Sequence, residues 1–544
     1  MVWLVLVPIL AGIGVYKLPR PAARAGALLA QVPLAILTAW HWRRAHTEGT
    51  FFEILGGDSA TLYVVLRGER TALALAALTV LLFAVSIAYC LRASYCDNRL
   101  LMLLLILQGL SMGVFLTDDI FNLFVLLEVA SLVAVLLVMY RKNRRNTYDG
   151  LYYLLIQLVA MAFFLFGVAY LYRSFGVLHV TTITELIASG AVSGRELLLP
   201  LAMILTGVGL KAGLFPLFSY LPRSYGNPGA PSVMLLLMSA VLVKGALFWV
   251  YRLQAMFQPG LDASSLLLVV GLLTGLAGAA MALGQADIRM LLAYSTISQV
   301  GLITVAISAG AAAGAQLHLI THALAKSVLF LGAAIIIRRY GTGRLRDIRG
   351  VGLRMPLLTI LLVVAAVSMV GMPLTAGAVS KGLIEAGAGG PSSAAVWAIN
   401  VCTFLVMARL AVVLFGEPKA PTLTVAWRPV PDQMAVTAVL AIALLGVGFF
   451  APQASLWVTG QAAPSQFWPS ATKAWQFVLL AALAIVAVLL VGRLNGSPRG
   501  PALAERLRLP WTDTLSLPHA ALALTVFFTG VVAWGTLVTR GGAS

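Results

Sequence analysis

Long, uninterrupted apolar runs constrain the fold of this chain more than any other feature of its sequence. An α-helix needs roughly 20 apolar residues to cross about 30 Å of hydrocarbon, and about sixteen runs of suitable length can be marked. They fall near residues 1–18, 22–42, 71–92, 99–117, 119–140, 150–172, 196–220, 231–255, 263–284, 287–310, 313–338, 355–386, 393–416, 433–452, 473–492 and 516–538. The runs are continuous rather than alternating, which argues against a membrane β-barrel. The sequence therefore predicts an all-α polytopic membrane protein.

Composition supports the same class. Hydrophobic residues make up 60% of the 544 residues and charged residues only 10%, against about 25% charged in an ordinary soluble domain. These values exclude a soluble enzyme, a disordered chain and a fibrous protein. The net charge of +18 could suggest a nucleic-acid partner, but in so apolar a chain we interpret it as loop charge facing an anionic leaflet.

The distribution of Lys and Arg predicts an orientation in the cell membrane. The first run has no basic region before it and no small-residue cleavage site, so we interpret it as a span rather than a signal peptide. With the N-terminus outside, inner loops hold 23 of the 37 Lys and Arg residues and outer loops hold 9, among them Arg252. This positive-inside bias favours both termini outside. Residues 43–70, the longest polar stretch near the N-terminus, are predicted to form a short outer-face hairpin around Gly56 and Gly57.

Several ionisable residues lie inside the predicted spans, where a charge costs about 3 kcal/mol on insertion scales. The basic ones are Lys211, Lys244, Lys326, Lys381 and Arg409, and the others are Glu128, Glu385, His318 and His322. So many buried charges in one chain indicate a hydrated interior or a line of paired charges rather than ordinary helix packing.

Each of these residues also has a structural interpretation. Arg409 could snorkel or clamp a neighbouring helix, and Lys244 could be one partner of a structural ion pair. His318, His322 and Lys326 follow at intervals of four residues, which places them within about 80° on one helix face. That stripe could be a packed polar seam. A metal site is disfavoured because no Cys or carboxylate joins the stripe, and a proton relay fits the residue types better.

Two spans are interrupted by proline close to a lysine. Pro216 follows Lys211 by five residues, and Pro373 precedes Lys381 by eight. A proline inside a span interrupts the hydrogen-bond ladder, which is tolerated where protein or a cavity satisfies the backbone. The two breaks lie five spans apart, and an odd offset reverses the orientation. The pattern therefore favours an inverted-repeat transporter with one broken helix in each half.

With these features, the sequence resembles a known family: the antiporter-like proton-translocating subunits of complex I, membrane-bound hydrogenases and Mrp-type Na+/H+ antiporters. The segments that carry the resemblance, in order, are DDIFNLFVLLEV (118–129), GLKAGLFPLFSYLP (209–222), APSVMLLLMSAVLVKG (230–245), DIRMLLAYSTISQVG (287–301), HLITHALAKSVLFLGA (318–333) and GMPLTAGAVSKG (371–382). Within this family the chain looks most similar to the Mrp D-subunit group, on DIFNLFVLLE and on the loop GTGRLRDIRGVG (341–352).

The resemblance implies a fold of about fourteen core helices with two inverted five-helix repeats, here followed by about two further helices. The expected domains are N-terminal helices with the outer-face hairpin (1–98), a first repeat (99–255), a second repeat (256–416) and C-terminal helices (417–544).

The resemblance also implies a role for each matched residue. Glu128 and Lys211 match the ion pair that gates proton movement, and Lys244 matches the lysine that links the half-channels. His318, His322 and Lys326 match the central stripe. Lys381 matches the basic residue of the second broken helix, the expected proton exit.

The chain departs from the family pattern in three places. The loop LPRSYGNPGAP has Arg223 and no His, Ala378 stands where Phe is common, and the 493–515 linker is too short for the long lateral helix of an L-type subunit. Three cysteines without a CxxC motif, and no Fe–S, flavin or quinone signature, predict that the chain holds no cofactor or metal.

The favoured function is a proton-translocating subunit of a multisubunit cation/proton (Na+/H+) antiporter, working with other hydrophobic subunits and without a catalytic centre of its own. Two alternatives stay open: the same module in a redox complex, where the complex would be a translocase, or in an inorganic-carbon uptake complex. A membrane anchor without transport is disfavoured because an anchor gains nothing from buried charges.

Overall fold

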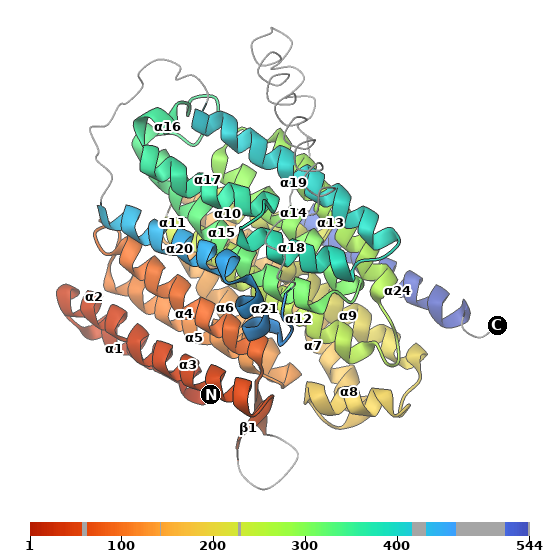
Figure 1. Cartoon of the computed structure of the whole chain (residues 1–544). Helices are drawn as coiled ribbons and strands as arrows, with labels where there is room; N and C mark the ends of the chain where they lie inside the picture. The colour runs from red at the N-terminus through yellow and green to blue at the C-terminus, as the bar shows by residue number, and fades with distance from the viewer. Residues whose placement is uncertain (57–62, 142, 227–229, 416–430, 464–516, 542–544) are drawn as a thin grey trace. The chain divides into compact units, whose positions relative to one another are not determined.

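The computed structural model describes the chain apart from residues 57–62, 142, 227–229, 416–430, 464–516 and 542–544 (Figure 1). The first elements are α1 (Val2–Lys17), α2 (Arg20–Leu29), α3 (Gln31–Thr47), β1 (Phe51–Leu55), β2 (Val64–Gly68), α4 (Arg70–Cys90), α5 (Asn98–Leu116), α6 (Ile120–Val138), α7 (Arg144–Phe175) and α8 (Val180–Ala188). Then come α9 (Gly194–Ala212), the 3-10 turn η1 (Leu217–Ser219), α10 (Tyr220–Gly226), α11 (Ser232–Leu237), the π-helical turn η2 (Met238–Leu242) and α12 (Val243–Phe257).

The second half of the chain is also helical where it is described. Its elements are α13 (Ser264–Gly284), α14 (Ile288–Ser308), α15 (Ala312–Tyr340), α16 (Val351–Arg354), α17 (Pro356–Val370), α18 (Ala376–Gly387), α19 (Pro391–Phe415), α20 (Pro431–Phe449), α21 (Ala451–Thr459) and α24 (Leu517–Gly541).

The helices confirm the predicted all-α membrane class. Among the described residues, 13 helical stretches are long and apolar enough to cross a membrane, and α1 and α17 are shorter apolar helices. Together they correspond to all the predicted runs except 473–492, which lies outside the described residues. The chain is a multi-pass membrane protein.

Polar residues at the helix ends explain where several spans begin and end. The side chains of Asp97, Asp119 and Asn143 accept hydrogen bonds from the first-turn amides of α5, α6 and α7, which satisfies donors that have no partner in the helix. At the other end, Gly176 and Gly341 close α7 and α15 in the left-handed conformation, which a residue with a Cβ adopts at a cost. These short polar signals divide the apolar sequence into separate spans.

One face of α6 carries a stripe of exposed apolar side chains. Phe121, Val125, Val129, Leu132 and Leu136 are the exposed large apolar side chains of this helix. They recur at intervals of three or four residues, so they share one face. In water such a stripe would be unfavourable, whereas in a bilayer it contacts lipid.

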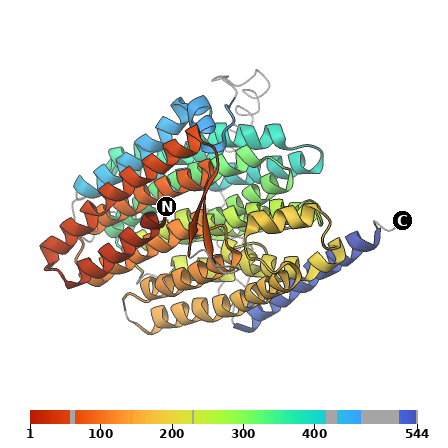
Figure 2. The ribbon, with the colours of Figure 1, turned by 90° about the horizontal axis from the view of Figure 1, so that it is seen from below.

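The chain divides into two compact units by its internal contacts. The first comprises the described residues of Met1–Leu267, Trp457–Gly460 and the C-terminal segment that contains α24. In it, α1 and α4 pack on α5, α6 packs on α7, and α9 packs against α7, α12 and α24. Figure 2 shows α24, in blue, running beside α7 and α9.

The second unit comprises the remaining described residues from Leu268 onward. Its central helix is α15, which packs against α14, α17, α18 and α20. Nearly all residues of α15 from Ala315 to Ile336 are buried. The helix that carries the histidine stripe is therefore surrounded by protein on all sides.

The predicted hairpin corresponds to a two-stranded antiparallel sheet, in which Phe51 pairs with Gly68 and Leu55 with Val64 (Figure 2). Part of its connection, including Gly57, lies outside the described residues. The side of the membrane on which the sheet lies stays a prediction.

Both helix breaks occur, and each begins at a glycine before the proline. Helix α9 ends at Ala212, followed by Gly213 at φ 76°. Helix α17 ends at Val370, followed by Gly371 at φ 90°. A left-handed glycine ends a helix cleanly, and the prolines then prevent the ladder from continuing. Each unit thus contains one broken helix with a lysine beside the break.

Candidate functional site

Glu128 of α6 and Lys211 of α9 form an ion pair in the first unit, in which the lysine is buried and the glutamate is partly exposed. The Lys211 Nζ lies 3.8 Å from the Glu128 Oε2. It also donates to the Leu127 carbonyl at 3.2 Å and to the Ser131 hydroxyl. The lysine is 7% exposed, so these three acceptors on one helix take the place of water. The structure therefore brings together two residues that are 83 positions apart in the sequence.

The break in α9 gives Lys211 its place. The lysine lies in the last turn of α9, and its own carbonyl accepts a hydrogen bond of 2.8 Å from the Tyr220 hydroxyl across the break. A cavity of about 30 Å³ adjoins it, with Lys211, Ser131, Tyr153 and Tyr220 among its lining residues. A volume of this size, with several polar groups in its wall, is enough for one water molecule. The cavity thus has room for one water molecule beside Lys211.

Lys244 lies on α12, directly after the π-helical turn Met238–Leu242. Its side chain is 0% exposed, and within the described part of the chain its Nζ has no hydrogen-bond partner. A buried ammonium group without a partner is costly. The structure therefore gives no sign of the structural ion pair that was one interpretation of this residue.

His318 of α15 is held by two side chains of the second unit. Its Nδ1 lies 2.9 Å from the Ser380 hydroxyl and its Nε2 lies 3.0 Å from the Gln299 Oε1. The Gln299 amide donates to Thr403 at 2.7 Å, and that hydroxyl donates onward to the Ile399 carbonyl. In this orientation the amide oxygen of Gln299 faces Nε2, so it accepts the proton of that nitrogen when Nε2 is protonated. The Ser380 hydroxyl faces Nδ1 and also lies within hydrogen-bond distance of the Ala376 and Gly377 carbonyls.

Lys326, two turns after His318, is bound much as Lys211 is. Its Nζ donates to the Leu292 carbonyl at 3.0 Å and to the Ser295 hydroxyl, both on α14. In each unit, a lysine thus binds a carbonyl and a serine hydroxyl within one turn of a neighbouring helix. His322 lies between the two, with its ring centroid 5.9 Å from that of His318.

Lys381 of α18 binds the end of the other half of its broken helix. Its Nζ donates to the Met369 carbonyl at 2.7 Å and lies 3.5 Å from the Val370 carbonyl, both at the C-terminus of α17. The last carbonyls of a helix have no partner within it, and the helix dipole places negative charge there. Ser380, whose hydroxyl contacts the His318 ring, is the residue directly before Lys381 on α18.

Other predicted groups have different surroundings. The Arg409 guanidinium of α19 donates to the Gln285 carbonyl just after α13, which fits the structural interpretation of a clamp. Glu385, four residues after Lys381 on α18, is exposed, so its prediction as a buried charge is wrong. Its carboxylate accepts from the Asn400 amide at 3.4 Å. In the described residues, no three His, Cys, Asp or Glu side chains are arranged to hold a metal ion.

Sequence reasoning missed the groups that hold the lysines. Ser131 and Ser295 each follow a carbonyl acceptor within one turn, and single serines in apolar helices give no signal of their own.

The placement of Arg252 among the nine outer-loop charges is wrong. Arg252 is a residue of α12, 5% exposed, and it pairs with Asp118, so it does not need water to stabilise its charge.

Comparisons with known proteins agree with this architecture. Residues 117–406 match the transmembrane family described as NADH:quinone oxidoreductase/Mrp antiporter. The N subunit of the NADH-quinone oxidoreductase of Desulforudis audaxviator is 37% identical over 289 residues, which cover 51% of this chain and 57% of that protein. The D subunit of the Na(+)/H(+) antiporter of Alkalihalophilus pseudofirmus is 32% identical over 276 residues, covering 49% and 55%. The matches thus span little more than half the length of these relatives.

Two solved structures share the fold over most of the chain. One is the membrane-bound sulfane sulfur reductase, an archaeal respiratory membrane complex, with a TM-score of 0.77, 24% identity, and coverage of 84% of this chain and 96% of the matched one. The other is the Mrp complex from Dietzia sp., with a TM-score of 0.77, 21% identity, and coverage of 84% and 95%. Both matched chains come from multisubunit membrane complexes.

Proposed function

This chain belongs to the NADH:quinone oxidoreductase/Mrp antiporter transmembrane family, and on that premise we propose that it moves protons as one subunit of a multisubunit cation/proton (Na+/H+) antiporter. The observation that carries the proposal is the Glu128–Lys211 pair, in which two opposite charges lie 3.8 Å apart in an apolar helix bundle beside a break. Such charges are costly in a membrane, and they commonly mark an ion pathway.

In the first unit, the pair acts as a switch. Opposite charges at this distance stabilise one another strongly in a medium of low dielectric constant. Separating them leaves a buried charge without compensation, and the transfer of a proton relieves that cost. The broken end of α9 allows Lys211 to move relative to α6, because the hydrogen-bond ladder does not continue past Ala212. Lys244 on the adjacent α12 is the next acceptor or donor of the proton.

In the second unit, the path follows α15 and ends at the broken helix. The ring of His318 can receive a proton at Nδ1 and release one from Nε2, since each nitrogen has an oxygen partner. Ser380 connects this ring to the helix that carries Lys381. From His318, the stripe continues along α15 toward its C-terminal end through His322 to Lys326. Each step changes the electrostatic environment of the next group and involves no covalent chemistry.

A second function has specific support. The match to the N subunit of an NADH-quinone oxidoreductase favours a proton module driven by a partner's redox reaction, whereas the match to the D subunit of an antiporter favours cation exchange. Affinity purification separates the two. Small hydrophobic subunits without redox centres favour the antiporter, flavin or Fe–S subunits favour the redox complex, and a large zinc-site partner would point to inorganic-carbon uptake.

The replacement Lys211→Ala tests the pathway. In membrane vesicles that contain the assembled complex, we expect this variant to abolish proton transport, because the switch loses its cation. The amount of assembled complex, measured by purification through a partner subunit, is expected to stay the same.

Arg409→Gln is the matched control. It also removes a cation from the interior of a span, but that cation binds the Gln285 carbonyl and lies outside the proposed path. The control is expected to transport protons normally. Normal transport by Lys211→Ala would overturn the pathway.

A further inference from the structure

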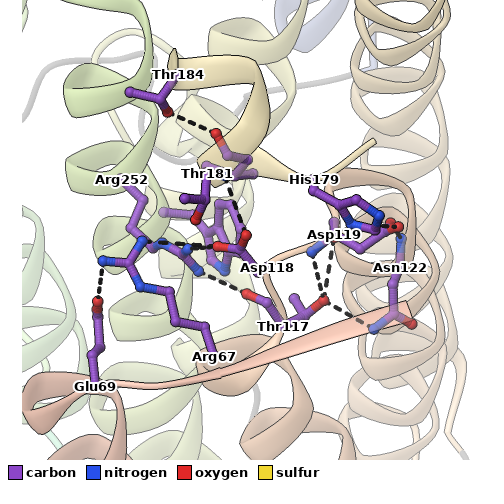
Figure 3. Close-up of polar contacts among 12 residues, drawn as sticks. Arg67, Glu69, Thr117, Asp118, Asp119, Asn122, His179, Thr181, Thr184 and Arg252 are labelled. Carbon is purple, nitrogen blue, oxygen red and sulfur yellow. Dashed lines mark hydrogen bonds and ion pairs between the residues drawn. The ribbon is translucent and has the colours of Figure 1, made fainter. Parts of the chain in front are cut away.

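Four segments of the first unit meet around Arg252, near the end of α12 (Figure 3). They are β2, the connection between α5 and α6, the first turn of α8, and α12 itself. Arg252 pairs with the Asp118 carboxylate, and Arg67 of β2 lies 3.8 Å from the same carboxylate oxygen. Arg67 also pairs with Glu69 at 2.8 Å. None of these contacts belongs to the proposed proton path.

Asp118 is fixed from several directions. It is 1% exposed, and its second carboxylate oxygen accepts from the Thr181 amide at 3.2 Å. Its own amide donates to the Val65 carbonyl, and its carbonyl accepts from the Val180 amide, both at 2.8 Å. A carboxylate bound in this way has a defined position, because every direction of movement breaks a hydrogen bond.

Arg252 uses this fixed carboxylate to hold α12. One guanidinium nitrogen reaches Asp118, and another donates to the Thr117 carbonyl at 2.7 Å. The guanidinium lies over the Trp249 ring at 4.6 Å, and the indole N–H of Trp249 donates to the Val114 carbonyl at 2.7 Å. The last turns of α12 are therefore attached to the end of α5 and the start of α6.

The contact between Arg252 and the α5–α6 connection lies at similar separations, measured along the helices, from Lys244 on α12 and from Glu128 on α6. Lys244 precedes Arg252 by eight residues on α12, and Glu128 follows Asp119, the cap of α6, by nine. At 1.5 Å per residue these separations along the two helices are about 12 and 13.5 Å. The other end of α12 follows the π-helical turn, where the helix departs from regular geometry. The attachment at Arg252 thus determines the axial position of Lys244 relative to Glu128.

We propose that Arg252 is a positioning residue for proton transfer, acting through Asp118 to hold Lys244 in register with Glu128. The inference rests on the proposed function, because it assumes that Lys244 takes part in transport. The charged groups around Arg252 are Asp118 from the α5–α6 connection and Arg67 and Glu69 from the region of β2. Glu185, the acidic residue of the adjacent α8, is exposed, and His179 at the start of α8 lies 4.0 Å from Asp119 instead.

The test compares proton transport by Arg252→Gln, Asp118→Asn and the double variant, in vesicles that contain the full complex. We expect each variant to slow transport per assembled complex about tenfold, equivalent to about 1.4 kcal/mol in the barrier. The double variant should be no slower than either single one, since the attachment can be lost only once. It also leaves no buried charge unpaired, so it tests the proposal if a single variant fails to fold.

The pH profile of transport separates positioning from simple destabilisation. Loss of folded complex lowers the rate by the same factor at every pH, whereas a displaced Lys244 changes the pH at which the rate is half-maximal. Arg252→Lys, which keeps the cation but not the planar fork, should recover part of the rate and of the wild-type profile. Arg173→Gln, an exposed arginine in the last turn of α7, is the control and should retain both.

The outcomes distinguish this inference from the proposed function. Normal rate and profile in the double variant, together with loss of transport in Lys211→Ala, overturn only the role of Arg252. Normal transport in Lys211→Ala overturns the proposed function itself. Additive losses in the two single variants, with an unchanged pH profile, would show that Arg252 and Asp118 act separately and only on stability.

Discussion

At the scale of single residues, the two lysines of the first unit differ in their surroundings although both are buried in apolar helices. Lys211 has a carboxylate, a carbonyl and a hydroxyl within reach. Lys244 has no hydrogen-bond partner among the described residues. Lys211 is therefore stabilised where it lies. Lys244 instead lowers the stability of the folded protein, so its presence is explained by a role in transport rather than by a role in folding.

This contrast predicts opposite effects of the same substitution. Lys244→Met should raise the midpoint of thermal unfolding of the purified complex, because it removes a buried charge whose cost is about 3 kcal/mol on insertion scales. Lys211→Met should lower the midpoint, because it leaves Glu128 and the Ser131 hydroxyl without their partner. Both variants should lose transport. A lower midpoint for Lys244→Met would show that the lysine is a structural residue after all.

At the scale of elements, the broken helix formed by α17 and α18 depends on close backbone approach as well as on proline. Gly377, at the start of α18, is packed so tightly that an added Cβ would lie 1.7 Å from the Ser368 carbonyl oxygen of α17. The same glycine donates its amide to the Ser368 hydroxyl at 3.1 Å. The two half-helices are thus in direct contact beside Lys381.

Substitution of this glycine should disturb the break. We expect Gly377→Ala to move α18 away from α17, to weaken the Lys381 contact with the Met369 carbonyl, and to slow proton transport. Gly382→Ala lies in the same helix, and its added Cβ meets nothing within 4 Å, so it should transport normally. Transport rates and unfolding midpoints of the two alanine variants, measured side by side, check this. Equal behaviour of both would mean that the close contact is not needed.

At the scale of the whole molecule, the orientation in the membrane is predicted from loop charge alone. The prediction of an external N-terminus rests on the excess of Lys and Arg in alternate loops. Three spans, α4, α5 and α6, separate the end of α3 from the start of α7. These two points must therefore lie on opposite sides of the membrane.

Single cysteines at the two points can show which side is which. In a variant with Cys402 replaced by Ser, an impermeant maleimide added to intact cells should label Glu48→Cys. It should label Arg144→Cys only after the membrane is opened. The variant without an introduced cysteine is the control, because Cys90 and Cys96 are buried. The reverse labelling pattern would invert the predicted orientation and place the β1–β2 hairpin inside.

The membrane class, the spans and the buried residues Lys211, Lys244 and Lys326 follow from the amino-acid sequence alone. Apolar length, capping residues and the cost of a charge in hydrocarbon are local properties, so they can be read without knowing what packs against what. The lysines beside Pro216 and Pro373 could be singled out for the same reason.

What these residues contact is set by the packing of distant segments. The partners of Lys211, His318 and Lys381 come from other helices, and their positions follow from packing, which no local pattern encodes. The same is true of Arg252, which looks like a loop charge in the sequence and is buried in the structure because Asp118, 134 residues away, compensates it. The burial of a charged side chain can be predicted from sequence only when the group that neutralises it is near in the sequence. For Arg252 that group lies in a distant segment of the chain.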